Sequence, residues 1–517
     1  MSKDTAPYSQ TVVPAEATGT VTVPSSKSHT IRALLIAACA DGPSRIENVL
    51  DSADAQSCIA ALRELGVTVR VSSAHGEAGG GGGLSVEVVP PAGGMLGRAG
   101  AEAVGAGGGQ IAGHHPAPAQ IDVGNSGTTL YLLTGLAALR PGGICFDGDE
   151  SIRRRSAARL HDALRSLGAT VSAPPAEAGS AAPAAADPEA PTTAGCAPYC
   201  VSGPPQAGRT VAVESPTSQY LSALLLMAPL IPAPMSESST GATTGFDIRL
   251  LYERPYVDMT CWWLDQQGIE YTRREHEFFA VPAGQRYRPF ERALPGDYSS
   301  ATFWFCAAAV TGGTVEVRGL APDDVQGDRQ VLEILRTLGC TVEQGTEAVR
   351  VSGPITAGGR FDLNAMPDAL PALAVAACFA PEPVELVNVP QAREKETDRI
   401  AVIAEELGRL GAHVEEMPDG LVVYPAGALG ANAGSPLRGG TVSSHGDHRI
   451  AMAMAVAALA ASGPVTIEDA GAAAVTYPEF FTHLAQVAPG SVQLGVGQAA
   501  GGPGESAASS QSTDSAP

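Results

Sequence analysis

Lysine is almost absent from this sequence of 517 residues, which contains only Lys3, Lys27 and Lys395. Arginine supplies nearly all of the remaining positive charge. An ammonium is a compact, strongly hydrated charge whose pKa changes readily on burial, whereas a guanidinium stays charged. A chain that uses arginine for general positive charge therefore makes its two internal lysines, Lys27 and Lys395, candidates for chemistry.

Positive charge is also scarce overall, and the formal net charge is −22. Summed repulsion argues against nucleic acids and anionic membranes as partners. A small anionic substrate is still compatible with this charge if its pocket is locally basic. Cations do cluster, at residues 153–159 and again at Arg393, Lys395 and Arg399, although a solvated helix face explains such clusters equally well.

The sequence lacks long hydrophobic runs and metal-binding cysteine spacings. The most apolar stretches, residues 220–231 and 450–461, are too short and interrupted to span a bilayer, and residues 1–14 contain no signal-peptide core. Of the nine cysteines, Cys196 and Cys200 fall in a Pro/Ala-rich loop and the others occur singly in apolar contexts. We expect a cytoplasmic protein with reduced, buried thiols and no metal.

Part of the length consists of segments that cannot bury enough apolar surface to fold. They are rich in Gly, Ala, Pro and Ser, and we expect them to be surface excursions between strands: residues 74–83, 91–118, 174–198, 232–245 and 426–437. By the same argument residues 488–517 are predicted to form a disordered tail.

One pattern recurs along the rest of the chain: a helical segment ends in an apolar residue and Gly, and a β-rich stretch follows. It occurs at residues 61–69, 163–171, 263–271, 334–342 and 406–414. The Gly fits the left-handed position just after a helix, where the chain reverses into a strand. Five copies predict an α/β protein built from internal repeats.

The stretch at residues 24–33 joins a short apolar strand to a helical run over residues 33–40. Ser28 is predicted to cap this helix, and Arg32, four residues later, lies on the same face. The first-turn N–H groups, the Lys27 ammonium and the Arg32 guanidinium then point at one spot, which makes a small anion-binding cup. Taken alone, the spacing is weak evidence, because Ser, Lys and Arg near a helix start most often form a solvated helix cap.

Similar helix starts recur at residues 122–129, 215–220, 296–301, 366–370, 391–399 and 447–449. Capping explains most of their Ser, Thr, Asn and Asp residues one at a time, although Gln219 has no capping reason. So many polar helix starts suggest that helix N-termini converge on one polyanionic ligand.

A series of short motifs runs in order along the chain: Ser26-Lys27-Ser28 with Arg32, Gly124-Asn125-Ser126-Gly127-Thr128, Asp147-Gly148-Asp149, Ser218-Gln219-Tyr220, Arg254-Pro255-Tyr256, Gly296-Asp297, Pro367-Asp368-Ala369, Lys395-Glu396-Thr397-Asp398-Arg399 and Asp447-His448-Arg449. In these motifs the chain, from about residue 21 to residue 484, resembles the 5-enolpyruvylshikimate-3-phosphate synthase (3-phosphoshikimate 1-carboxyvinyltransferase) family. The excess over the family's usual length falls in the low-complexity segments.

The resemblance implies the fold of that family, a two-domain inside-out α/β barrel with six βαβαββ repeats, three per domain. The first domain would span residues 21–294, and the second would combine residues 1–20 with residues 295–487. Helix N-termini would face the cleft between the domains, and binding of the substrates would close it.

The resemblance also implies a metal-free, cofactor-free addition–elimination between shikimate 3-phosphate and phosphoenolpyruvate, and we expect a monomer. Asp368 would be the base and Lys27 the proton donor, with Glu396 a second acid/base candidate. Shikimate 3-phosphate would be bound by Lys27, Ser28, Arg32, Thr217, Ser218, Gln219, Asp368, Gln391 and Lys395. Phosphoenolpyruvate would be bound by Lys27, Gly127, Arg155, Gln219, Arg399 and Arg449.

Three positions depart from the family pattern. Tyr131 stands where many members have Arg, Glu253 aligns with a Ser that often binds the shikimate phosphate, and Val475 aligns with a Lys that contacts phosphoenolpyruvate. They motivate one alternative, a non-catalytic or altered-acceptor paralogue. A second alternative is the sister enzyme that acts on UDP-N-acetylglucosamine, which needs a Cys in the loop at residues 150–156, where this chain has none.

Overall fold

The computed structural model describes residues 8–73, 83–92, 94–96, 118–140, 142–174, 195–233, 242–425 and 435–493. Most of each predicted low-complexity segment, and residues 494–517 of the predicted tail, lie outside these ranges. The described start of that tail is not loose, because Val492–Gln493 form strand β24 and pair with Gln10–Val12 (β1). Among the described residues, no helix is long and apolar enough to cross a membrane.

The described strands form six four-stranded sheets, and each sheet contains one parallel pair and two antiparallel pairs. Three sheets lie in the N-terminal half: β14(Glu291–Ala293)-β3(Ser44–Val49)-β5(Leu84–Val89)-β4(Thr68–Ser73), β6(Ala119–Asp122)-β7(Ile144–Asp147)-β9(Tyr199–Ser202)-β8(Thr170–Ser172) and β10(Thr210–Ser215)-β11(Thr243–Leu251)-β13(Phe278–Pro282)-β12(Thr272–Arg274).

The other three sheets lie mainly in the C-terminal half and take up the first two strands of the chain. They are β16(Thr341–Gln344)-β17(Ala348–Ser352)-β15(Thr314–Arg318)-β2(Thr18–Thr22), β18(Gly359–Asp362)-β19(Val384–Val387)-β21(Gly420–Tyr424)-β20(His413–Met417) and β22(Gly440–Ser443)-β23(Val465–Glu468)-β1-β24. The sixfold pattern agrees with the predicted repeats.

Helices fill the interior of each half. The first half contains α1 (Lys27–Cys39), α2 (Ala53–Glu64), α3 (Gly127–Ala137), α4 (Glu150–Arg154), α5 (Ala158–Ser166), α6 (Ser218–Met227), η1 (Ala228–Leu230) and α7 (Arg254–Gln266). The second contains α8 (Tyr298–Thr311), η3 (Gly327–Gln330), α9 (Val331–Thr337), η4 (Pro367–Ala369), α10 (Leu370–Ala377), η5 (Pro390–Glu394), α11 (Arg399–Arg409), α12 (His448–Leu459), η7 (Ala470–Val475) and α13 (Phe480–Val487).

Several of these helices are apolar all round, which is typical of helices that are buried on every side. In α8 every residue but the last is buried, and in α10 and α12 every residue is buried. Helix α11 has a polar outer side, with Glu405, Gly408 and Arg409 exposed. The sheets therefore cover a helical interior, which is the inside-out arrangement.

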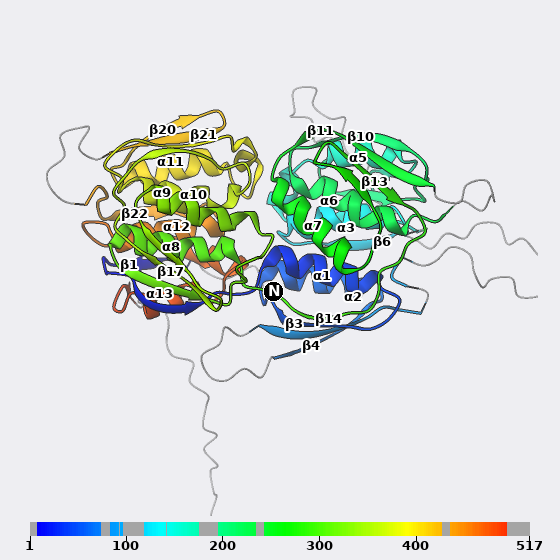
Figure 1. Cartoon of the computed structure of the whole chain (residues 1–517), viewed down its shortest axis with the longest axis horizontal. Coiled ribbons are helices and arrows are strands. Elements are labelled where there is room, and N and C mark those ends of the chain that lie inside the picture. Colours follow the sequence, from blue (N-terminus) through cyan, green and yellow to red (C-terminus); the bar gives the residue numbers. More distant parts are fainter. Residues whose placement is uncertain are drawn as a thin grey trace, which may run out of the picture.

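The two halves lie side by side, one carrying α1–α7 and the other α8–α13 (Figure 1). Each has its own hydrophobic core. The chain crosses between them twice, at neighbouring points: Ser25 and Gly296 form a β-bridge, and the Ser26 N–H donates to Pro295 O at 2.9 Å. We propose a division into two domains at these crossings, which keeps the predicted boundary near residue 294. The other boundary moves from residue 21 to residue 24, because Val21 and Val23 belong to the second core.

The cysteines differ from the prediction in one respect. Cys200 lies in β9 rather than in a loop, directly opposite Cys145 of β7, and a disulfide joins the two. The strand register brings them together across 55 positions of sequence, and no local spacing indicates such a pair. The other seven cysteines carry free thiols.

The close packing of α3 on α6 gives a stability prediction. A Cβ on Gly135 of α3 would lie 2.5 Å from the Ala223 carbonyl oxygen of α6, which cannot move independently of its helix. We expect Gly135→Ala to lower the free energy of unfolding by about 1–3 kcal/mol through overpacking. Denaturant unfolding followed by circular dichroism measures this change.

Gly408→Ala is the matched control, because Gly408 lies in α11 with nothing within 4 Å of an added Cβ. Alanine is the better helix former, so this variant should be neutral or more stable by up to about 1 kcal/mol. Equal destabilisation by both substitutions would contradict the packing described here.

Candidate active site

The N-terminal ends of helices from both halves meet at one cavity. It is lined by Lys27, Ser28, Arg32, Asp54, Gly127, Thr128, Arg155, Ser218, Gln219, Glu253, Tyr256, Pro367, Asp368, Lys395, Glu396, Arg399, His448 and Arg449. Most of these residues lie at or just before the first turn of α1, α2, α3, α6, α7, α10, α11 or α12. Six cations and four carboxylates surround a volume of about 60 Å³. A protein whose net charge is strongly negative therefore contains a locally basic pocket.

The structure brings together nearly all of the residues predicted for the site. Thr217 and Gln391 alone, among the predicted set, do not line the cavity. Both lie close behind the lining, where the Thr217 hydroxyl donates to Glu253 at 3.2 Å and the Gln391 amide donates to the Asn364 carbonyl at 3.2 Å.

Lys27 is the first residue of α1, and its ammonium lies 3.0 Å from Asp54 Oδ2. Burial lowers the pKa of Lys27, but the negative charges of Asp54, Glu396 and Asp368 outweigh burial, and the net pKa is raised. Lys27 is therefore a protonated, partly buried cation that reaches the cavity from the first half.

Asp368 faces Lys27 from the second half and is bound by two arginines. Arg399 Nη1 donates to Asp368 Oδ1, and Arg449 Nη2 pairs with Oδ2, each at 2.8 Å. Burial raises the pKa of Asp368, but the charges of Arg449, Arg399, Lys395 and Lys27 together hold it well below its usual range. In this arrangement Asp368 is ionised and a weak base.

Arg399 is buried and is held by three carboxylates. Besides Asp368, it donates to Asp447 through Nε at 2.8 Å and to Glu396 through Nη2 at 2.5 Å. Glu396 in turn lies 3.4 Å from Arg155 Nη2 of the first half. Burial raises the pKa of Glu396, and the charges of Arg399 and Arg155 lower it well below its usual value.

Several buried donors around the cavity have no partner among the described residues: Arg449 Nε and Nη1, Arg155 Nε, and both ring nitrogens of His448, one of which carries a proton. Buried polar groups are normally paired, and all three residues line the cavity, so their unpaired donors favour a ligand rich in acceptor oxygens. Forked guanidiniums suit paired phosphate or carboxylate oxygens.

Arg32 is less open to a ligand than the sequence suggested. Its guanidinium donates to Thr260 Oγ1, Ser28 O, Ser222 Oγ and Tyr256 O at 2.9–3.3 Å. One Nη1 hydrogen is left for a ligand. Burial is also the main reason that the pKa of Arg32 falls to about 10.

Of the three departures from the family pattern, only Glu253 lines the cavity. Tyr131 is buried behind it, with its ring against Tyr220 at 5.1 Å between ring centroids, and Val475 ends η7. One of the three departures from the family pattern therefore lies in the cavity lining, and the other two lie outside it.

Sequence reasoning assigned no role to several residues of the site. Asp54, the partner of Lys27, sits in the first turn of α2 and has the appearance of an ordinary capping acid. Asp447 caps α12 and also pairs with Arg399. Asp328 of η3 accepts a hydrogen bond from the Tyr256 hydroxyl at 2.6 Å. A local sequence pattern carries no signal for these contacts between segments distant in the chain.

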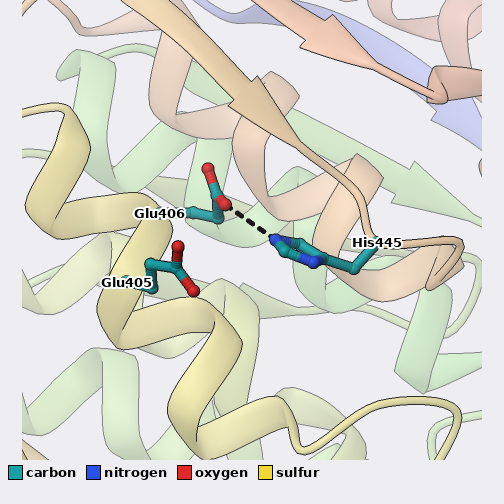
Figure 2. A group of neighbouring side chains, drawn as sticks. All are labelled: Glu405, Glu406 and His445. Atoms are coloured by element: carbon teal, nitrogen blue, oxygen red, sulfur yellow. Dashed lines mark hydrogen bonds and ion pairs between the residues drawn. The ribbon is translucent and has the colours of Figure 1, made fainter.

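A second acidic cluster, formed by Glu405, Glu406 and His445, lies on α11 and the loop before α12 (Figure 2). Its ligand atoms lie within 4.8 Å of one another. The two glutamates already have a cationic partner in the protein, because the Arg409 guanidinium lies 2.7 Å from Glu405 and 3.6 Å from Glu406. Buried Glu406 accepts a hydrogen bond from the Ser443 N–H and pairs with His445. We therefore interpret the cluster as a structural contact that holds the loop before Asp447 against α11.

Asp328 gives a prediction about pH. Burial, and then the charge of Asp368, raise the pKa of Asp328 from 3.8 to about 7. Between these values the folded chain keeps a proton that the unfolded chain releases, so this group's contribution to stability is lost as the pH rises through about 7. Asn cannot ionise. The difference in unfolding midpoint between Asp328→Asn and the wild type should therefore shift in favour of the variant as the pH rises from about 5 to about 8. A difference that does not change with pH would contradict the raised pKa of Asp328.

The sequence profile of the family described as EPSP synthase (3-phosphoshikimate 1-carboxyvinyltransferase) matches residues 13–91 and 96–484. The 3-phosphoshikimate 1-carboxyvinyltransferase of Acetivibrio thermocellus is 39% identical over 474 residues, which cover 91% of this chain and 96% of that protein. The enzyme of the same name from Chlamydia caviae is 33% identical over 475 residues, 92% of each chain.

Solved structures give the same answer for the fold. EPSP synthase from Acinetobacter baumannii superposes with a TM-score of 0.68 at 25% identity, covering 94% of this chain and 99% of that one. The enolpyruvyl transferase NikO from Streptomyces tendae, at 18% identity and a TM-score of 0.63 over 93% and 97% of the two chains, shows the fold alone. The fold is the two-domain enolpyruvyl transferase fold, and the chain belongs to the EPSP synthase family.

Proposed function

We propose that the chain transfers the enolpyruvyl group of phosphoenolpyruvate to the 5-hydroxyl of shikimate 3-phosphate and releases inorganic phosphate. The observation that carries the proposal is the cavity itself, where cations with unpartnered donors from both halves face a protonated Lys27 and an ionised Asp368. The names of the curated relatives point to the same reaction.

In the first step the 5-hydroxyl adds to C2 of phosphoenolpyruvate while C3 takes a proton. Lys27, whose pKa is raised, is the proton donor, and Asp368 accepts the hydroxyl proton. In the second step the tetrahedral intermediate loses a C3 proton and expels phosphate, which leaves an enol ether. Glu396 is the second candidate for proton transfer, since it stands between Arg155 and Arg399.

Asp368 must become a stronger base than its two arginine partners allow. Phosphoenolpyruvate carries a phosphate and a carboxylate, and both would take donors from Arg399 and Arg449. Each donor that turns from Asp368 to the substrate raises the pKa of Asp368 toward its ordinary value. Binding of one substrate therefore activates the base that acts on the other.

The remaining residues are proposed to position the two substrates. Arg155, Arg399 and Arg449, with Gly127 and Gln219, would bind phosphoenolpyruvate, and Ser28, Arg32, Thr217, Ser218, Gln391 and Lys395 would bind shikimate 3-phosphate. The single chain provides the whole lining, so we further propose that it acts as a monomer, in the cytoplasm where both substrates are soluble acids. Neither alternative gains support, because no Cys lies in residues 150–156 and the lining retains its cations.

Substitution of the two proposed proton-transfer residues tests the mechanism. Lys27→Met and Asp368→Asn should each lower kcat by about 10²–10⁴-fold, the usual contribution of a general acid or base. A coupled phosphate-release assay measures turnover, and circular dichroism checks that the variants are folded. Lys3→Met is the matched control, since it removes the one lysine to which no role is assigned.

Full activity of either variant would contradict the assigned roles. The acceptor is tested in the same assay by offering shikimate 3-phosphate and UDP-N-acetylglucosamine separately. Phosphate release with the second acceptor alone, or tight binding of both substrates without turnover, would refute the proposed function.

A further inference from the structure

The Glu253 side chain occupies a cup of hydrogen-bond donors inside the cavity. Its Oε2 accepts from the Ser218 N–H at 3.1 Å, the Ser218 hydroxyl at 2.8 Å and the Thr217 hydroxyl at 3.2 Å. Its Oε1 lies 2.5 Å from the Lys395 ammonium. Glu253 is only 2% exposed, so a buried carboxylate holds all four of these donors.

This set of donors is the kind that proteins use for phosphate. Ser218 begins α6, and its N–H is at the positive end of the helix dipole. Two hydroxyls and an ammonium complete a charge-assisted cup from both halves, since Thr217 and Ser218 come from the first half and Lys395 from the second. The same three residues are among those proposed to bind shikimate 3-phosphate.

The backbone holds Glu253 in place for this contact. It stands immediately before α7 with φ 56° and ψ 44°, in the left-handed region that residues other than glycine rarely adopt. Its N–H donates to Asn364 Oδ1 of the second half at 3.2 Å. The carboxylate is thus directed into the cup from a fixed position.

We propose that Glu253 competes with the acceptor's phosphate for this cup. The carboxylate must leave Thr217, Ser218 and Lys395 before the phosphate binds, because two anions sharing one cup repel each other strongly at low dielectric. The inference rests on the proposed function, since it takes shikimate 3-phosphate as the acceptor. Glu253 is then a specificity-determining residue that weakens acceptor binding.

The expected size of the effect follows from the occupancy of the cup. The apparent dissociation constant rises in inverse proportion to the fraction of molecules that can bind, so occupancy by the carboxylate about 90% of the time weakens binding about tenfold. Glu253→Ser, which removes the carboxylate and leaves a small hydroxyl, should lower the KM for shikimate 3-phosphate by about tenfold or more. The KM for phosphoenolpyruvate, which binds other cations, should change little.

Glu253→Gln separates charge from volume, because the amide fills the same space without the charge, and it should lower the KM by less than Glu253→Ser. Glu275→Gln is the matched control. Glu275 also has a left-handed backbone, with φ 48°, but it is exposed and does not line the cavity. Its substitution should leave both KM values unchanged.

Calorimetric titration with shikimate 3-phosphate keeps this inference distinct from the proposed function. If the wild type turns over but neither Glu253 variant has a lower KM for shikimate 3-phosphate, the inference is overturned and the proposed function stands. If no protein turns over, the function fails. Tighter binding of shikimate 3-phosphate by Glu253→Ser than by the wild type would still support the competition, and equal or weaker binding would overturn it.

Discussion

The site depends on the pairing of buried cations with the protein's own carboxylates. Arg399 shows this most clearly, since it is buried among Asp368, Glu396 and Asp447. Removing one partner of such a buried pair costs about 3–5 kcal/mol, because it leaves an uncompensated charge. We propose that substrate anions bind the donors that have no partner and also take over donors that the protein's carboxylates now hold.

The architecture places these charges where they can be exchanged. Apolar helices fill both halves, and residues at the starts of α3, α6, α10 and α12 line the cavity. The two crossings of the chain, at residues 24–26 and 295–297, are adjacent to each other. Two ion pairs join the halves at the cavity, Arg155 with Glu396 and Lys395 with Glu253.

Much of this was predictable from the sequence, and the physical reason is local. Helix starts, left-handed glycines and two internal lysines are features of short segments, and they were sufficient to indicate α/β repeats and a polyanion site that includes Lys27. The role of Asp368 was implied only by the resemblance to the family. The contacts that Asp54, Asp328 and Asp447 make with their partners were not foreseen, because they join segments far apart in the chain. Cys145 and Cys200 were missed for the same reason, since only strand register places them opposite each other. Glu253 was identified as a departure, but its position in the donor cup is a property of the fold.

The most direct test is a crystal structure of the chain with shikimate 3-phosphate and phosphoenolpyruvate or a non-reactive analogue of it. The account predicts that ligand oxygens replace protein carboxylates, so that Lys395 and Ser218 contact the acceptor's phosphate and Arg449 contacts phosphoenolpyruvate. A complex with both ligands bound, in which Glu253 still holds Lys395 and Asp368 still holds Arg399 and Arg449, would contradict it.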